Sequence, residues 1–125
     1  MSAGLILFAH GARDPLWAGP FEAVAAGVRA AQPQAEVRLA FLEFMAPGLP
    51  EAGAELARAG CTTVAVLPLF LGGSGHVRRD LPPMLDELRR THPAVRFALL
   101  PAVGEIDSVV GAMVDVALHA LVEVA

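Results

Sequence analysis

Two histidines stand where the chain could do chemistry. His10 follows the apolar run of residues 5–9 and precedes Gly11, and His76 follows the glycine-rich segment Gly72-Gly73-Ser74-Gly75. The glycines before His76 let the backbone bend sharply and approach a bulky ligand. An imidazole nitrogen suits a divalent first-row metal ion, and neutral imidazole accepts a proton near neutral pH. The two histidines therefore predict a site that handles a metal ion, protons or both.

Charged residues elsewhere in the chain could complete the site of the two histidines. Glu43 follows a strongly apolar segment, where it could ligate a metal ion or accept a proton, or else point to solvent. Three cations, Arg13, Arg78 and Arg79, could hold carboxylates or phosphates through paired hydrogen bonds, or be solvated partners of neighbouring aspartates. Two further histidines, His92 and His119, fall inside or at the end of predicted helices, and we assign neither of them to the chemistry.

An alternation of strands and helices must position these residues. The apolar runs predict strands over residues 5–9, 37–42, 63–67 and 95–100, each followed by a helix, over about 16–31, 47–59, 81–91 and 107 to nearly the C-terminus. Four such units predict an α/β fold with a four-stranded parallel sheet, helices on both faces and right-handed crossovers. Ligands of such sheets bind at the carboxyl ends of the strands, so the two histidines and Glu43 are expected to converge on one rim, which Glu105 also reaches.

Several details of the helices follow from local signals. Pro47 is expected in the first turn of the second helix, and Pro82 and Pro83 in the first turn of the third, which Asp80 would cap. Asp107 or Ser108 is expected to cap the last helix. Three helices are assigned inward-facing residues. The last helix carries a broader apolar surface than one sheet face needs, so part of it is expected to meet another subunit. The inward residues are Phe21, Val24 and Val28 in the first helix, Leu49, Ala52 and Leu56 in the second, and Met84, Leu85 and Leu88 in the third.

Composition narrows the class of protein. The chain has 125 residues, 55% of them hydrophobic and 18% charged, which predicts one folded domain over residues 1–125 rather than a disordered segment. A net charge of −4 argues against a general nucleic-acid binder. No apolar run is long enough to span a membrane. The single cysteine, Cys61, is expected to be a small buried hydrophobe and fits a reducing cytoplasm.

Common nucleotide motifs are missing from the sequence. The glycine-rich segment is not followed by Gly-Lys-Ser/Thr, and no Gly-x-Gly-x-x-Gly follows the first predicted strand, so nucleotide or phosphoryl chemistry has weak support. A hydrolase would need a nucleophile, for which Ser74 beside His76 is the candidate.

Three stretches of the chain resemble the short sirohydrochlorin cobaltochelatases (CbiX type), within the class II chelatases. They are residues 5–15 around His10, residues 40–43 ending in Glu43, and residues 68–82 around His76. The resemblance implies a flavodoxin-like domain that inserts Co²⁺, Fe²⁺ or Ni²⁺ into sirohydrochlorin or a related tetrapyrrole without ATP, in cobalamin or siroheme biosynthesis. The metal ion is then a substrate, and no tightly bound cofactor is expected. Ala12 stands where the family often has serine.

The resemblance also implies roles for individual residues. The family's two catalytic histidines match His10 and His76, and its acidic metal-site residue matches Glu43. Larger relatives place the site between two such domains, which implies a homodimer with a cleft between subunits. The substrate's carboxylates are expected to meet three arginines and the glycine-rich segment. These residues are Arg13, Arg78, Arg79, Gly73, Ser74 and Gly75. The alternative is a metal or tetrapyrrole carrier without enzymatic activity.

Overall fold

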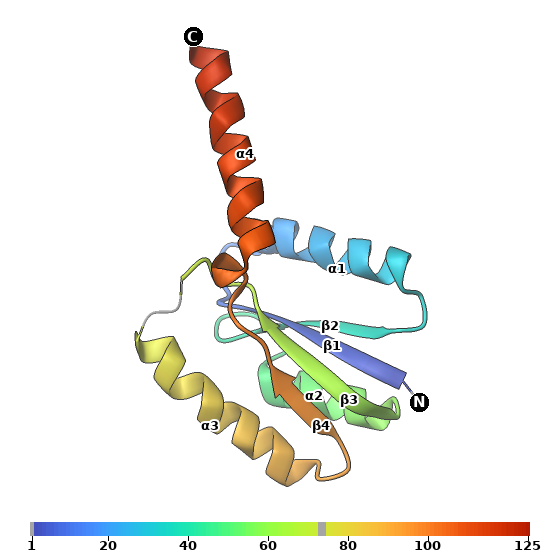
Figure 1. The fold of residues 1–125 in the computed structure, drawn as a ribbon. Helices are drawn as coiled ribbons and strands as arrows, with labels where there is room; N and C mark the ends of the chain where they lie inside the picture. Colours follow the sequence, from blue (N-terminus) through green and yellow to red (C-terminus); the bar gives the residue numbers. More distant parts are fainter. Residues whose placement is uncertain (1, 73–74) are drawn as a thin grey trace.

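The computed structural model describes residues 2–72 and 75–125, with the side chains of all of these except residues 2 and 75–77. Its centre is a four-stranded, all-parallel sheet with the strand order β2-β1-β3-β4 (Figure 1). The strands are β1 (Ser2–Ala9), β2 (Glu36–Phe41), β3 (Cys61–Pro68) and β4 (Arg96–Leu99). The predicted fold class, with all four strands in their expected places, is confirmed.

The two faces of β1 are covered by different helices, which is why this strand reads as a continuous apolar run. On one face Ile6 and Phe8 pack with residues of α2 (Leu49–Arg58) and α3 (Gly75–Thr91). On the other face Leu7 packs with Ala25 of α1 (Gly19–Ala31) and with Val37 of β2. Helices therefore lie on both faces of the sheet, α1 on one side and α2 and α3 on the other (Figure 1).

The third helix begins earlier than its prolines predict. It begins at Gly75 rather than Leu81, so Pro82 and Pro83 lie inside it and Asp80 is not its cap. Burial explains why the helix tolerates them, because Leu81, Leu85 and Leu88 repeat at helical spacing and are buried against the sheet. Tertiary packing here outweighs the local preference of proline.

Three smaller predictions about helices are also corrected. The second helix begins at Leu49 with Pro50 in its first turn, so Pro47 precedes it, joined to Ala46 by a cis peptide bond. Val24 of the first helix is exposed rather than inward. Neither Asp107 nor Ser108 caps the last helix, because Ile106 occupies the cap position without a side-chain bond. The inward positions of the second helix are confirmed, since Leu49, Ala52 and Leu56 are all buried.

The last helix, α4 (Asp107–Val124), covers neither face of the sheet. It follows the short helix η2 (Val103–Glu105), with which it makes its principal contacts in the chain, and projects away from the body (Figure 1). No residue of α4 is buried. Among the described residues, no helix has both the length and the apolar character that crossing a membrane requires.

Candidate active site

The strand order places the candidate site. Along the chain, β1 is followed by β2 on one side of it and, after the next crossover, by β3 on the other side. Connections on opposite sides leave a crevice outside the carboxyl ends of the two central strands, and ligands of open α/β sheets bind there. His10 follows β1 directly, and the segment leading to His76 follows β3. The sheet topology thus brings two distant segments to the same switch point.

The His10 side chain lies exposed at this point. Its ring stacks on the ring of Phe70, with centroids 4.2 Å apart and an interplanar angle of 35°. Phe70 is itself buried and contacts Phe8 of β1, so the exposed imidazole packs against a residue of the hydrophobic core. No hydrogen bond ties the imidazole to another described residue, which leaves its nitrogens available for a proton or a metal ion.

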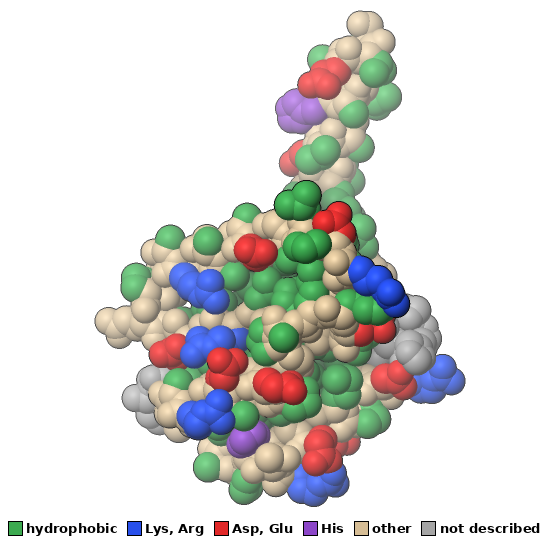
Figure 2. Space-filling view, turned by 180° about the vertical axis from the view of Figure 1, so that it is seen from behind, with side chains coloured by type: hydrophobic (Ala, Val, Ile, Leu, Met, Phe, Trp, Pro, Cys, Tyr) green, Lys and Arg blue, Asp and Glu red, His purple; other side chains and the backbone are tan. Residues whose placement is uncertain are grey.

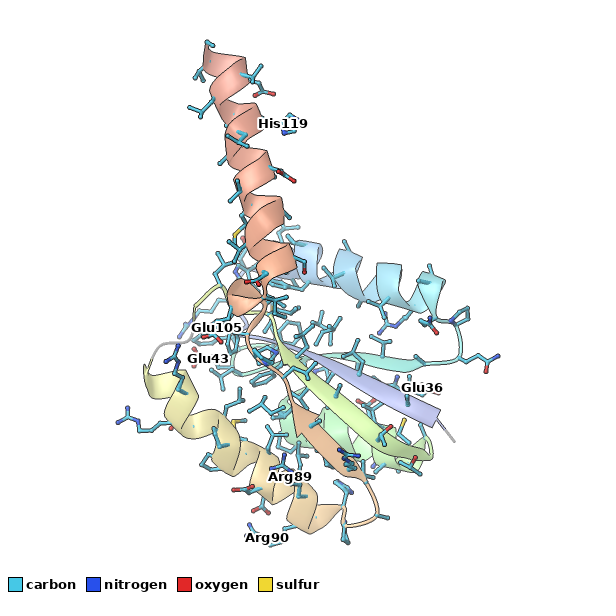
Figure 3. The ribbon with its side chains drawn as sticks, viewed as in Figure 1. Glu36, Glu43, Arg89, Arg90, Glu105 and His119 are labelled. Carbon is cyan, nitrogen blue, oxygen red and sulfur yellow. The ribbon has the colours of Figure 1, made fainter. Side chains whose placement is uncertain are left out.

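Backbone hydrogen bonds join the segment of Glu43 to that of His10. The ladder between β1 and β2 continues past the strand ends, where the Leu42 amide donates to the Ala9 carbonyl at 2.9 Å and the Glu43 amide to the His10 carbonyl at 3.0 Å. Gly11 makes this close approach possible. Its φ is +90°, and a Cβ atom there would overlap the Glu43 carbonyl oxygen. The exposed carboxylate of Glu43 is therefore carried on the same rim as His10 (Figure 3).

An aromatic side chain next to Glu43 adds a feature that the sequence analysis missed. Phe44 has a φ of +66°, an uncommon conformation for a bulky residue, and its side chain is 58% exposed. The Arg13 guanidinium lies 4.8 Å from the centre of its ring, a cation–π contact. Strained backbone that presents an exposed aromatic ring is found most often at ligand sites. In the sequence, the only indication of this feature is the position of Phe44 directly after Glu43 at the end of a predicted strand.

On the β4 side, the rim has a cleft. Arg78 and Glu105 form an ion pair at 3.0 Å across it, and Phe70 lies at its floor. Its volume is about 190 Å³. Ligand pockets typically enclose about 300–1,000 Å³, so the cleft that the described residues of one chain form is smaller than a usual ligand pocket. The remaining lining is largely apolar: Pro68, Leu81, Pro82, Leu99, Leu100, Pro101 and Ala102.

Some predicted site residues are not brought together in what the structure describes. Gly73 and Ser74 lie outside the described residues, and for His76 only the backbone position in the first turn of α3 is described. Among the described side chains, no three histidine, cysteine or acidic residues are grouped closely enough to hold a metal ion. Arg79 is exposed, and Arg78 pairs with Glu105.

The remaining histidines lie away from the rim, as predicted. His92 follows α3 at the opposite end of the sheet, where its ring approaches Phe97 of β4. His119 lies on the projecting helix, and its Nδ1 is 2.8 Å from the Asp115 carbonyl oxygen (Figure 3). Neither histidine is placed to contribute to chemistry at the switch point.

The fold and the site together define a parallel α/β protein with a histidine-bearing rim at its topological switch point. Comparison with known proteins gives the family: the CbiX family model matches residues 4–120, and the chain belongs to this family. A crystal structure of a putative cobalamin biosynthesis CbiX protein from Marinobacter aquaeolei is 29% identical and covers 97% of this chain and 98% of its own, with a TM-score of 0.84. The resemblance found in the sequence is confirmed.

Other relatives match only part of their own length. A sirohydrochlorin cobaltochelatase of Saccharolobus solfataricus is 33% identical over 86 residues, 66% of this chain and 62% of the relative. SirB from Bacillus subtilis, in a structure with Fe³⁺, is 25% identical over 90% of this chain and 44% of that protein, with a TM-score of 0.76. The chain thus spans about half to two thirds of the length of the curated relatives that it matches.

Proposed function

We propose that residues 1–125 form one chelatase domain that inserts a divalent metal ion, Co²⁺, Fe²⁺ or Ni²⁺, into sirohydrochlorin or a related tetrapyrrole without ATP. The observation that carries the proposal is the exposed imidazole of His10 at the switch point, which packs on Phe70, is joined through the backbone to Glu43, and makes no hydrogen bond to another described residue. Membership of the CbiX family and the names of its relatives support this substrate class. The reaction would serve cobalamin or siroheme biosynthesis.

The chemistry of insertion explains why an open, histidine-containing rim suits the task. As the metal ion enters the macrocycle, two pyrrole N–H bonds break and two protons must leave. A neutral imidazole can take up such a proton near neutral pH. The enzyme must also release the metal ion, which a closed cage of four strong ligands would retain. In this proposal His10 and His76 present the metal ion, and one of them accepts protons from the macrocycle.

The neighbouring charges have supporting roles in this scheme. Glu43 would bind the metal ion or pass protons to water, because its exposed carboxylate lies on the His10 rim. Arg13, Arg78 and Arg79 would hold the carboxylates of the tetrapyrrole, together with the backbone of Gly73, Ser74 and Gly75. Arg78 would then exchange its partner Glu105 for a substrate carboxylate, a modest cost because the pair is largely exposed.

The size of the substrate supports a homodimer. A tetrapyrrole is larger than the cleft of about 190 Å³ at the rim of one chain, so a second copy would complete the site. The free, buried thiol of Cys61 supports a reaction in the reducing cytoplasm. We expect no tightly bound cofactor, since the metal ion is consumed as a substrate.

The direct test is an absorbance time course of sirohydrochlorin with each metal ion, with and without catalytic amounts of the protein. Faster spectral change over many turnovers is expected. His10→Ala and His76→Ala should each reduce the rate by about 10²–10⁴-fold, the usual worth of a positioned acid–base group. His92→Ala, the matched control at the other end of the sheet, should retain full activity. Binding of metal ion or tetrapyrrole without turnover would instead identify a carrier, and full activity of His76→Ala would refute the assignment of the site.

A further inference from the structure

One half of a sheet face is left without a helix. On the α1 side, β3 and β4 present side chains that none of the described helices covers, among them the small Ala65 and Ala98. A depression of about 230 Å³ lies over the amino-terminal part of these strands, and another of about 490 Å³ lies between the carboxyl-terminal end of β3, α1 and the base of α4. We call the two together the open sheet groove. It is lined by Ala3, Gly4, Thr63, Val64, Ala65, Arg96 and Ala98, and then by Pro20, Phe21, Val24, Leu67, Leu69, Leu71, Val103 and Val109.

Helix α4 has an apolar surface without a partner in this chain. After its first turn, which holds Asp107 and Ser108, the polar residues of α4 repeat every four positions and so form one narrow stripe: Asp115, His119 and Glu123. Small or apolar residues occupy the rest of the circumference. Figure 2 shows the same division, with acidic and histidine side chains along one side of the projecting helix and hydrophobic ones along the other. Leu118 is 55% exposed and Leu121 64%. A helix that is apolar around most of its circumference is normally buried.

The base of α4 is held in a way that directs the helix outward. The Gly104 amide donates to the Phe70 carbonyl at 3.0 Å, and a Cβ atom on Gly104 would overlap the Leu71 carbonyl oxygen. Glu105 is paired with Arg78 of α3. In a doubly wound sheet the helix after the last strand returns across that strand's face. Here the anchored connection sends it away, and the face that it would have covered is the open sheet groove.

We propose that α4 of one copy lies in the open sheet groove of a second copy, and that the second copy's α4 lies in the groove of the first. Such a reciprocal exchange uses the same two surfaces on both subunits and closes into a two-fold dimer. The helix is long enough to cover the groove: the 18 residues of α4 span about 27 Å, and the segment from Thr63 to Leu69 along the bottom of the groove spans about 20 Å. The alanines of the sheet leave room for a helix at close distance.

The area and the charges also fit a second copy. Half the surface of a cylinder about 10 Å wide and 27 Å long is about 420 Å², so two helices and two grooves would together bury about 1,700 Å². Stable interfaces typically bury about 1,600 Å² in total. Arg96, the one charged residue among those lining the groove, lies toward its amino-terminal end. A partner helix that enters from the carboxyl edge would bring Glu123, the last residue of its polar stripe, toward Arg96, while Asp115 and His119 remain toward solvent.

The exchange rests on the groove and the helix, not on the chemistry of the rim. It nonetheless fits a shared active site, because Val103 and Val109 at the base of α4 border the groove, and Glu105 borders the cleft at the same edge of the sheet. Two copies joined in this way would bring their carboxyl edges toward each other. Oligomeric state and turnover can be measured separately, so failure of one proposal is distinguishable from failure of the other.

The first test is sedimentation equilibrium of the full chain and of two variants. The unaltered chain should be a dimer. Leu118→Asp with Leu121→Asp should weaken dimerisation by at least about 100-fold, because both charges would enter the apolar groove. His119→Asp, the matched control, adds a charge to the polar stripe and should remain a dimer. Circular dichroism should show that both variants are folded, since α4 packs little on its own chain. A monomeric unaltered chain, or an undiminished dimer of the double variant, would overturn the proposal.

The second test distinguishes exchange from other dimers. Chains with Ala98→Cys and chains with Leu121→Cys are mixed, allowed to exchange subunits, and treated with a short bis-maleimide. Cross-linked heterodimers should form in the mixture, and Ala98→Cys alone should form none; the natural Cys61 is buried and should contribute little. Cross-links of Leu121→Cys only to itself would mean that two α4 helices pair with each other outside the groove, and would refute the exchange. Chelatase turnover without the expected cross-links would refute the exchange while leaving metal insertion, as proposed above, intact.

Discussion

Replacement of Gly11 by alanine tests how the rim is built. The Gly11 backbone has a φ of +90°, and its α-carbon lies so close to the Glu43 carbonyl that an added Cβ would overlap the oxygen. An L-residue at positive φ costs about 1–2 kcal/mol. The overlap must also push the Glu43 segment away, at the expense of the hydrogen bond from the Glu43 amide to the His10 carbonyl, worth about 0.5–1.5 kcal/mol. We therefore expect Gly11→Ala to destabilise the protein by about 2–3 kcal/mol.

Thermal and urea unfolding followed by circular dichroism measure this loss. For a chain of 125 residues a loss of this size lowers the melting temperature by roughly 8–15 °C. Gly27→Ala is the matched control, because Gly27 lies within α1 with nothing near its missing Cβ, and alanine there should add about 0.5–1 kcal/mol of stability. The variant should also lose chelatase activity in excess of its unfolded fraction, because the Glu43 segment moves relative to His10. An unchanged melting temperature of Gly11→Ala would show that the two segments do not approach as closely as described.

Two further expectations follow from single side chains. Phe44→Gly should be more stable than Phe44→Ala by about 1 kcal/mol in urea unfolding, because both lose the ring but only glycine adopts a φ of +66° without strain. Both substitutions should also raise the KM for tetrapyrrole relative to the unaltered chain. An unchanged KM would exclude a contact between Phe44 and the substrate. Burial, with a smaller contribution from Glu36, raises the pKa of the Cys61 thiol, so above about pH 9 the unfolded chain loses the thiol proton while the folded chain retains it. Stability should fall as pH rises through this range, with a shallower fall in Cys61→Ala; equal slopes for the two proteins would contradict the raised pKa.

Much of the fold follows from the sequence because burial on both faces leaves a plain signal. The apolar runs of β1 and β3 identify buried parallel strands, and the spacing of Leu49, Ala52 and Leu56 identifies the inward side of α2. The start of α3 could not be predicted in the same way. Prolines ordinarily mark the beginning of a helix, and only the packing of Leu81, Leu85 and Leu88 on the sheet shows that the helix continues through Pro82 and Pro83.

The candidate site was predictable where it depends on strand ends, and not where it depends on tertiary contacts. Parallel strands carry the residues that follow them to one edge, so the placement of His10 and Glu43 on a common rim follows from the strand pattern. The support of His10 by Phe70 does not follow from it, because an aromatic residue in an apolar run reads as ordinary core. The positive φ of Phe44 and its contact with Arg13 depend on the path of one loop, which local sequence preferences do not specify.

The direction of α4 is another feature that the sequence alone does not predict. Its broad apolar surface indicates from sequence that something must cover the helix, and the uncovered face of β3 and β4 indicates in the structure that something is missing there. The helix and the uncovered sheet face are both largely apolar, and the helix is long enough to cover that face. The connection held at Gly104 keeps the helix of one chain from filling its own groove. The same connection carries Glu105 into the cleft beside Arg78. A second copy that satisfies the helix would therefore also adjoin the rim where one chain provides too small a site for a tetrapyrrole.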